Sequence, residues 1–527
     1  MTSDDKKLNI AEAKEEIKNT MKAYFAKNEY GEYLIPIERQ RPVFLMGPPG
    51  LGKTAIIKQI AEELDVGFNP YSMTHHTRQS ALGLPYIVQK EYNGKTYQVS
   101  EYTMSEIISE TYELIKETGK KEGILFLDEL NCVSETLSPV MLQLLQQKRF
   151  GEHKVPDGWI IVAAGNPPEF NNSVHQFDVV TWDRLKKIEI KYDFEVWKKY
   201  AVNTGVHPAI ISYLEVKVPN FYKIESTSEG QTYVTARGWD DLSSMVRTYE
   251  MLQIPVTTQL VVQYLTNYKI ASDFANYYDM YSKYKSDYQI DRILEGTFDD
   301  SIRARALRAK FDERIALLSL LADAIQVKAR KSVIDQMAAK ETQRVLIEIK
   351  DIAAKNPNGE TTIVLEHFDE ALANKQRTLD VGISAGSMSR RDISRMRAVI
   401  SMLGDLRTRC LKADDASKAM SIIREKFNSD VKSLRAKAKK IGAELDNELN
   451  FIKEVYGQGN EMLIFMTTLT MSWEIAKFVA DNGSEAYHEN DKEMLVTDRA
   501  PEIEKMIKEL TLTDDDLLDD DDNSDKK

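Results

Sequence analysis

The chain has 527 residues, of which 42% are hydrophobic and 29% charged, and its formal net charge is −13. That length predicts several domains, because a single hydrophobic core stops growing at about 250–300 residues. The acidic balance argues against a general nucleic-acid binder, since phosphate contacts need clustered lysine and arginine, and it leaves room only for a local basic groove. Two cysteines, far apart in the sequence, suit a reducing compartment better than a disulfide scaffold.

The sequence predicts a cytoplasmic protein with no membrane contact. The N-terminal stretch MTSDDKKLNIAEAKEE contains no apolar signal segment. The most apolar run, residues 462–480, includes Glu474 and Lys477, so we expect a buried amphipathic helix and not a membrane span.

Strands and helices alternate in the first 191 residues. We expect a helix at 9–28, a strand at 43–46 and a helix at 54–64. Further helices are expected at 103–119 and 135–147. The apolar runs GILFLDE (123–129) and WIIVAAG (159–165) read as buried parallel strands. This alternation predicts an α/β domain with a parallel sheet flanked by helices.

A β-hairpin interrupts this alternation at about residues 80–101. Its two strand-like halves flank Asn93-Gly94, which is the strongest two-residue hairpin signal.

The remainder reads as helical. We expect an α/β core at 1–193, an α-helical lid at 194–290 and an all-α C-terminal region at 291–510. The last segment, 511–527, carries eight Asp and two Lys, and such a run repels itself, which predicts a disordered acidic tail.

The stretch GPPGLGKT, residues 47–54, matches the phosphate-loop pattern G-x-x-x-x-G-K-[ST]. Its glycines allow a tight turn whose N–H groups point at phosphate oxygens, and the following helix adds its positive N-terminus. Lys53 supplies a charge for the β and γ phosphates, and Thr54 offers a hydroxyl to Mg²⁺. The alternative, a glycine-rich turn that matches by chance, is disfavoured by the strand before it and the helix after it.

Two further elements complete the expected site. Asp128, at the end of the run ILFLDE, can reach the Mg²⁺ shell, and Glu129 can polarise the water that attacks the γ-phosphate. Asn166 ends the next strand and can orient that water; the alternative is a turn-forming Asn before Pro167. Together these elements predict hydrolysis of a nucleoside triphosphate.

The ordered series GPPGLGKT, LFLDELN, LQLLQQKRFGEHKVPDGWIIVAAGNPPE, DRL and VTARGW resembles the AAA+ ATPases of the MoxR group, within the clade that carries an insert in its second helix. The resemblance covers about residues 10–290. The phosphate loop is widely shared, whereas GEHKVPDGWIIVAAGNP and ALGLPYI are more specific. The hairpin at about 80–101 matches the helix-2 insert, which projects toward the central pore in this group.

The resemblance implies ATP and Mg²⁺ as ligands and gives each motif a role. Asp128 and Glu129 match Walker B, Asn166 matches sensor 1, and Thr54 and Asp128 would hold Mg²⁺. The expected nucleotide-binding residues are Gly47, Pro48, Pro49, Gly50, Leu51, Gly52, Lys53, Thr54 and Ala55.

Two arginines complete the set of expected catalytic residues, which also includes Glu129 and Asn166. Arg184 matches the arginine finger that reaches a neighbouring subunit's nucleotide, although Leu185 stands where the family often has Phe. Its alternative is a surface ion pair with Asp183 or Glu189. Arg237 matches sensor 2.

Ala236 replaces the usual proline before Arg237, so the lid helix could start differently from the family pattern. The alternative for Arg237 is a partly exposed arginine at a helix start. Cys132, which follows the acidic pair, is expected to be a small packing residue and not a nucleophile.

The resemblance implies an ATPase that assembles into a homo-oligomeric ring, expected to be hexameric, and remodels a protein client in the manner of a chaperone. Many such ATPases act with a protein that carries a von Willebrand A domain. Two alternatives stay open: a nucleic-acid translocase or GTP-driven restriction-type subunit of the same clade, and a nucleotide-dependent scaffold with little turnover.

Overall fold

The computed structural model describes residues 7–73, 83–134, 136–150, 152–170, 174, 177–227, 230–355, 361–384 and 388–492. The chain forms two compact units. The first combines Met1–Tyr277 with Arg377–Ile393, and the second combines Tyr278–Gln376 with Ser394–Lys527. The predicted acidic tail at 511–527 and the first residues of the predicted insert, 80–82, lie outside the described residues.

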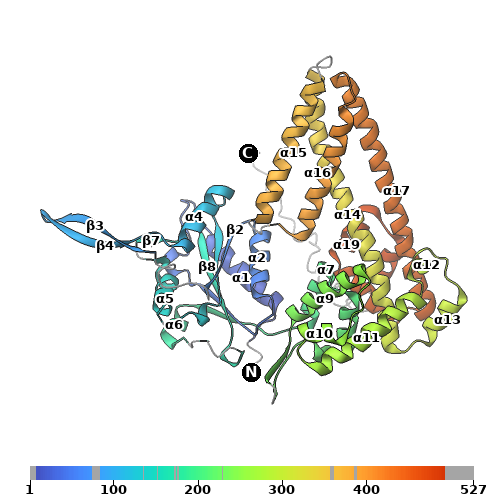
Figure 1. Ribbon diagram of the computed structural model, residues 1–527, viewed down its shortest axis with the longest axis horizontal. Coiled ribbons are helices and arrows are strands. Elements are labelled where there is room, and N and C mark those ends of the chain that lie inside the picture. Colours follow the sequence, from blue (N-terminus) through green and yellow to red (C-terminus); the bar gives the residue numbers. More distant parts are fainter. Residues whose placement is uncertain are drawn as a thin grey trace, which may run out of the picture. The chain divides into compact units, whose positions relative to one another are not determined.

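A five-stranded parallel sheet forms the centre of the first unit (Figure 1). In spatial order its strands are β2 (Gly67–Ser72), β5 (Gly123–Asp128), β8 (Trp159–Gly165), β1 (Val43–Met46) and β9 (Lys186–Glu189). All four pairings in this order are parallel. The predicted α/β architecture is therefore confirmed, and the expected strand at 43–46 has its predicted bounds.

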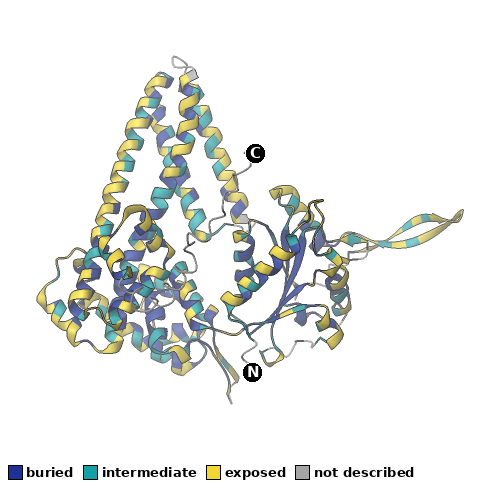
Figure 2. Ribbon diagram, turned by 180° about the vertical axis from the view of Figure 1, so that it is seen from behind, coloured by how far each residue is buried: buried dark blue, intermediate teal, exposed yellow. Residues whose placement is uncertain are grey.

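Helices cover both faces of this sheet because successive strand residues point to opposite sides. On β1, Val43 and Leu45 pack into one core with α1 (Ile10–Phe25) and α2 (Lys53–Glu63). Phe44 packs into the other core, which also contains residues of α4 (Glu106–Thr118) and α5 (Ser138–Gln147). Burial is deepest along the strands between the two helix layers (Figure 2).

The predicted hairpin is present between β2 and α4. Strand β3 (Pro85–Tyr92) pairs antiparallel with β4 (Lys95–Tyr102), and Tyr92 lies opposite Lys95 across a two-residue turn. Asn93 and Gly94 have φ values of 52° and 73°, the left-handed conformations that such a turn needs. The ribbon extends outward and most of its side chains are exposed (Figures 1 and 2).

A shorter hairpin contacts the base of this ribbon. It consists of β6 (Arg149–Phe150) and β7 (His153–Lys154). His153 Nε2 lies 3.0 Å from the Tyr102 carbonyl oxygen, so the two hairpins are connected where the long ribbon leaves the core.

The rest of the first unit is mainly helical and includes one hairpin that the sequence did not predict. Its elements are α6 (Val179–Asp183), α7 (Phe194–Thr204), α8 (Pro208–Val216), β10 (Lys223–Thr227), β11 (Gly230–Val234), α9 (Ala236–Leu252), α10 (Thr258–Tyr264) and the first half of α11 (Tyr268–Asp287). Trp239 is fully buried in this helical part, and its indole N–H donates to the Phe221 carbonyl at 3.1 Å.

The second unit is built from helices, as the sequence predicts. They are α12 (Ile290–Leu294), α13 (Asp300–Arg308), α14 (Phe311–Lys355), α15 (Thr361–Ser384), α16 (Arg390–Cys410), α17 (Ala416–Tyr456), α18 (Asn460–Met471) and α19 (Trp473–Asn482). Phe368, Val399, Leu403 and Cys410 belong to a core that α14 to α17 share.

The apolar run at 462–480, expected as one buried helix, forms two helices. It breaks at Ser472, and α18 and α19 meet at a bend of 86°. In the described part of the chain no single helix has the length and hydropathy to cross a bilayer; only this bent pair, taken together, meets the criteria of length and composition.

Candidate nucleotide-binding site

Three adjacent strands deliver the predicted site residues to one edge of the sheet. Strand β8 lies between β5 and β1, and all three run parallel. Asp128 ends β5, Asn166 follows β8, and the loop 47–52 follows β1. Because the carboxyl ends of parallel strands meet at the same edge, motifs more than 100 residues apart in the chain become neighbours.

The loop after β1 has a backbone that requires glycine. Gly50 and Gly52 have φ values of 75° and 85°, and Gly52 forms the N-terminal boundary of α2. A Cβ on Gly50 would lie 2.9 Å from Cβ of Thr235, the residue that precedes α9. The loop is thus packed against the start of α9 and leads into the N-terminus of α2, where unpaired N–H groups favour an anion.

Lys53 is held at the centre of this edge. Its side chain is 9% exposed, and Nζ donates to the carbonyl oxygens of Gly47 and Pro48 at 2.9 and 3.0 Å. A third bond joins Nζ to Oδ1 of Asn166 at 2.8 Å. The lysine of the phosphate loop and the predicted sensor residue are therefore in direct contact.

Burial of the Lys53 ammonium lowers its pKa to about 8. Loss of hydration is the largest cause, since a buried site disfavours the charged form. Asp128 and Glu129 raise this pKa again, whereas the like charge of Arg237 lowers it. Lys53 is thus a cation whose charge is easily lost above neutral pH.

The acidic pair after β5 adopts a specific geometry. Thr54 Oγ1 donates to Oδ2 of Asp128 at 2.6 Å. Glu129 has a φ of 55°, which is uncommon for a residue with a side chain, and its N–H donates to Asp128 Oδ1 at 2.9 Å. Among the residues that the structure describes, the Glu129 carboxylate has neither a hydrogen-bond nor an ion-pair partner, so it is available to a water molecule.

Cys132 follows in the same turn and is partly buried. Burial raises the pKa of its thiol, and the nearby charges of Glu129 and Asp128 raise it further. The thiol therefore stays protonated, which agrees with the expectation of a packing residue.

Asn131 is a residue of this site that the sequence analysis did not single out. It is 2% exposed, and its Nδ2 donates to the backbone carbonyl of Asn166 at 2.8 Å. The available signal was a polar residue directly after the acidic pair in LFLDELN, but nothing in the local pattern shows which group it contacts.

Arg184 lies at the C-terminal end of α6 and is exposed. The alternative weighed for Arg184, an ion pair with Asp183 or Glu189, is not found among the described residues, and Glu189 pairs with Lys187. The Arg184 charge acts on Asp178, whose pKa is lowered first by hydrogen bonds from Thr181 and to a smaller extent by Arg184. Within the described part of a single chain, Arg184 contacts none of the other predicted site residues.

Arg237 is the second residue of α9 and joins the lid to the phosphate loop through its backbone. Its N–H donates to the Gly50 carbonyl at 3.2 Å, while the side chain is exposed. Thr235 caps the helix, since its Oγ1 accepts from the Gly238 N–H at 3.1 Å. The helix therefore starts at Ala236, directly before Arg237.

A tyrosine provides a second contact between the lid and the loop. The Tyr222 hydroxyl donates to the Pro49 carbonyl at 2.9 Å, and its ring stacks on Tyr192 with a centroid separation of 4.8 Å. Burial raises the pKa of Tyr222, so the hydroxyl is a permanent donor. Tyr222 was not predicted as a site residue, because no sequence motif marks it.

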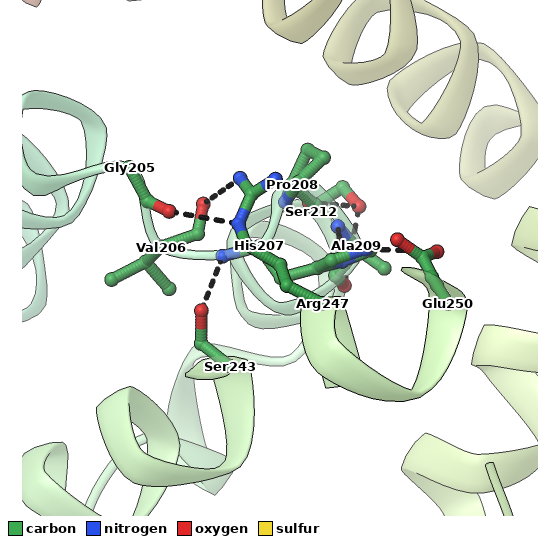
Figure 3. Close-up of polar contacts among 9 residues, drawn as sticks. All are labelled: Gly205, Val206, His207, Pro208, Ala209, Ser212, Ser243, Arg247 and Glu250. Atoms are coloured by element: carbon green, nitrogen blue, oxygen red, sulfur yellow. Dashed lines mark hydrogen bonds and ion pairs between the residues drawn. The ribbon is translucent and has the colours of Figure 1, made fainter. Parts of the chain in front are cut away.

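The far half of α9 is anchored inside the lid (Figure 3). The backbone N–H of His207 donates to Ser243 Oγ at 2.7 Å, and His207 Nε2 lies 3.2 Å from Glu250 Oε1. Arg247 Nε donates to the Gly205 carbonyl at 3.0 Å. Ser243, Arg247 and Glu250 share one face of α9, so the helix that begins at the phosphate loop is fixed to the turn between α7 and α8.

The residues present fit a nucleotide phosphate chain with Mg²⁺. A hydroxyl and a carboxylate, from Thr54 and Asp128, lie side by side and are the oxygen ligands that Mg²⁺ prefers. The glycine loop, Lys53 and the N-terminus of α2 provide the donors that phosphate oxygens need. In the described residues no group of three or more His, Cys, Asp or Glu side chains is arranged to hold a metal ion.

Comparison with known proteins agrees with this geometry. Residues 42–185 match the model of the AAA domain, dynein-related subfamily. No curated protein matches the chain. A putative ATPase from Cytophaga hutchinsonii ATCC 33406 is 18% identical, with 37% of this chain and 55% of that chain covered and a TM-score of 0.24.

The Thermotoga maritima RuvB Holliday junction branch migration motor is also 18% identical; 47% of this chain and 67% of that chain are covered, with a TM-score of 0.25. The match to the Cytophaga structure spans about half of that structure's length. The family match covers β1, the phosphate loop, β5, β8 and Arg184. Residues 42–185, about a quarter of the chain, are therefore the part that is similar to an AAA domain of the dynein-related subfamily.

Proposed function

We propose that this protein hydrolyses ATP in a MoxR-like AAA+ ring and uses the energy to remodel a protein partner. The observation that carries the proposal is the convergence at one sheet edge of Lys53 with Asn166 and of Thr54 with Asp128. These pairs come from three separate segments of the chain and together form the groups that triphosphate hydrolysis requires.

The chain's own residues divide the work of binding. The N–H groups of loop 47–52 and the ammonium of Lys53 hold the β and γ phosphates. Thr54 and Asp128 would hold Mg²⁺, which would supply positive charge to neutralise the charge that develops on the phosphates. The contacts from Arg237 N–H to Gly50 and from Tyr222 to Pro49 hold the lid against the loop.

Glu129 and Asn166 act on the attacking water. The Glu129 carboxylate, free of other partners in the described structure, accepts a proton from water, and the Asn166 amide orients the same molecule. A general base contributes about 10²–10⁴ in rate, which makes Glu129 the most informative residue to change.

The exposed position of Arg184, without an ion pair in the described residues, supports its role as an arginine finger. In this proposal it serves the nucleotide of the next subunit, so turnover requires a homo-oligomeric ring, which we expect to be hexameric. An arginine supplied from a neighbour is worth about 10³–10⁵ in rate in phosphoryl transfer.

The client is proposed to be a protein, and a partner with a von Willebrand A domain is the first to test. The AAA match ends at residue 185, and the second unit of helices has no counterpart in it. We assign client docking to that second unit.

Steady-state phosphate release from the full chain tests the proposal. The wild-type protein is expected to hydrolyse ATP with Mg²⁺, and Glu129→Gln is expected to lose at least about 100-fold in turnover while still binding ATP. Glu117→Gln, an exposed change on α4, serves as the control. Equal rates for wild type and Glu129→Gln, or no hydrolysis at concentrations at which rings form, contradict the proposal.

Two further arms address the alternatives. A preference for GTP, or strong stimulation by DNA or RNA, would favour the translocase or restriction-type reading. Stable client capture by Glu129→Gln with ATP, absent from Lys53→Ala, supports the remodelling role.

A further inference from the structure

Asn131 joins the two strand ends on which the proposed chemistry depends. It lies in the turn Leu130–Cys132 that follows β5, two residues after Glu129. Its side chain is 2% exposed, and its Nδ2 donates to the backbone oxygen of Asn166 at 2.8 Å. A bond from a buried amide to the end of the neighbouring strand fixes these two segments relative to each other.

The other side of the Asn131 amide is held by a close fit to β8. A Cβ added to Gly165 would lie 2.3 Å from Asn131 Oδ1, so the amide packs directly against a residue that has no side chain. Asn131 thus contacts both Gly165 and Asn166, the last residue of β8 and the one after it.

The same turn also contains the proposed general base. Glu129 adopts a φ of 55°, and its carbonyl accepts from the Cys132 N–H at 2.9 Å, which closes the turn around Asn131. A left-handed backbone at a non-glycine residue persists only where its surroundings hold it. The Asn131 bond is a contact that can hold this turn.

A continuous series of contacts therefore runs through the site. Asn131 binds the backbone oxygen of Asn166, and the Asn166 side chain accepts from Lys53. The backbone oxygen and the side-chain oxygen of Asn166 each accept a hydrogen bond, so neither its backbone nor its side chain can rotate without breaking one.

We propose that Asn131 is a positioning residue, which sets the Glu129 carboxylate and the Asn166 amide at the separation needed to orient the attacking water. The inference rests on the proposed ATP hydrolysis. It predicts that Asn131 affects the rate of the chemical step and leaves nucleotide binding unchanged, because the hydrogen bonds that the Asn131 side chain makes among the described residues join Asn166 and Cys132 and not the phosphate loop.

The test uses the full chain with the change Asn131→Asp, which keeps the shape and replaces the N–H donor by an oxygen. We expect kcat to fall about 100-fold, since a misplacement near 1 Å costs about that much, while the KM for ATP changes less than about threefold. A lost kcat with an unchanged KM is the signature of an interaction needed at the transition state.

A pH profile separates positioning from simple packing. When the introduced carboxyl is protonated, its O–H can again donate to the Asn166 carbonyl, so kcat relative to wild type should rise as pH falls from about 8 to about 6. Asn131→Leu has neither a donor nor a titrating group and should stay slow across this range.

A matched control comes from the same sheet. Asn69 on β2 is 5% exposed, and its Nδ2 donates to Thr111 Oγ1 at 2.9 Å, away from the strand ends of the site. Asn69→Asp should lower the thermal midpoint without the selective loss of kcat. If Asn69→Asp slows turnover as much as Asn131→Asp does, the positioning role is wrong.

Gly165→Ala provides a second variant in case the Asn131 changes unfold the protein. Its new methyl would displace the Asn131 amide, so the same loss of kcat at unchanged KM is expected. The inference is overturned if folded Asn131 and Gly165 variants keep kcat within about twofold of wild type, or if their KM rises in proportion to the loss of rate. A wild-type chain that does not hydrolyse ATP would instead remove the proposed function, so the two failures are distinguishable.

Discussion

The Lys53 ammonium lies 2.8 Å from the Asn166 side-chain oxygen, although 113 residues separate them in the chain. This bond connects the start of α2 to the end of β8. A phosphate oxygen that binds Lys53 must compete with this amide for the same three N–H donors, so Asn166 is placed to respond when phosphate arrives.

Replacement of Asn166 by alanine should therefore separate binding from turnover. We expect Asn166→Ala to lower kcat by about 100-fold, the cost of one lost transition-state hydrogen bond, without raising the KM for ATP. Steady-state kinetics over a range of ATP concentrations measures both. A kcat within threefold of wild type would show that Asn166 does not act on the water.

Nucleotide affinity should depend on pH through Lys53. Its pKa in the folded protein is about 8, below the ordinary lysine value of 10.5, so the charge is lost as pH rises through about 8. The Kd for an ATP analogue should thus be constant below this value and rise above it. Titration by fluorescence from pH 6.5 to pH 9.5 measures the change.

The lowered pKa of Lys53 also makes the free energy of unfolding depend on pH. Between about pH 8 and pH 10.5 the unfolded chain binds more protons at Lys53 than the folded chain, so this residue makes folding more favourable as pH rises there.

Lys53→Arg, which stays charged, should remove the pH dependence of nucleotide affinity. A wild-type Kd that is constant up to pH 9.5 would contradict the assignment.

The contact from Tyr222 to Pro49 should strengthen nucleotide binding by holding the lid on the loop. Tyr222→Phe removes the hydroxyl and keeps the ring that stacks on Tyr192. One hydrogen bond is worth about 0.5–1.5 kcal/mol, so the Kd for ATP should weaken about 2- to 13-fold.

Tyr200→Phe is the matched control, because the Tyr200 hydroxyl bonds to Asp240 within the lid and not to the loop. Isothermal titration of both variants measures the difference. Equal ATP affinities for the two variants would show that the hydrogen bond from Tyr222 to Pro49 does not determine nucleotide binding.

If Arg184 completes the nucleotide site of the neighbouring subunit, a mixture of two variants that are inactive alone should regain ATPase activity. Arg184→Ala alone should lose about 10³-fold or more in rate, and Glu129→Gln should be inactive. When both are mixed before assembly, a subunit with an intact Glu129 can receive Arg184 from its neighbour, so part of the activity should return.

Phosphate release across mixing ratios measures this recovery. Arg41→Ala, an exposed arginine near the start of β1, is expected to keep full activity. Assembled mixtures that stay inactive, together with monomers that turn over at the wild-type rate, would exclude a site completed by a neighbour.

Several features were predictable from the sequence because local chemistry specifies them. Gly50 and Gly52 adopt conformations that only glycine takes without cost, and Asn93-Gly94 forms the expected two-residue turn. Apolar runs bounded by polar residues predicted β5 and β8 as buried parallel strands, as the sheet shows. The hairpin β10–β11 was not predicted, because its residues, KIEST and GQTYV, are mostly polar and have no two-residue turn signal.

The sequence by itself determined the phosphate loop, the acidic pair and the buried strands β1, β5 and β8 of the sheet, since each depends on neighbours a few residues away. Only the tertiary structure decided that Asn131 binds the Asn166 backbone across 35 residues and that Tyr222 reaches Pro49 across 173. These contacts exist because β8 inserts between β5 and β1 and because α9 starts beside the loop. Burial likewise lowers the Lys53 pKa, and burial belongs to the packed fold and not to any local pattern.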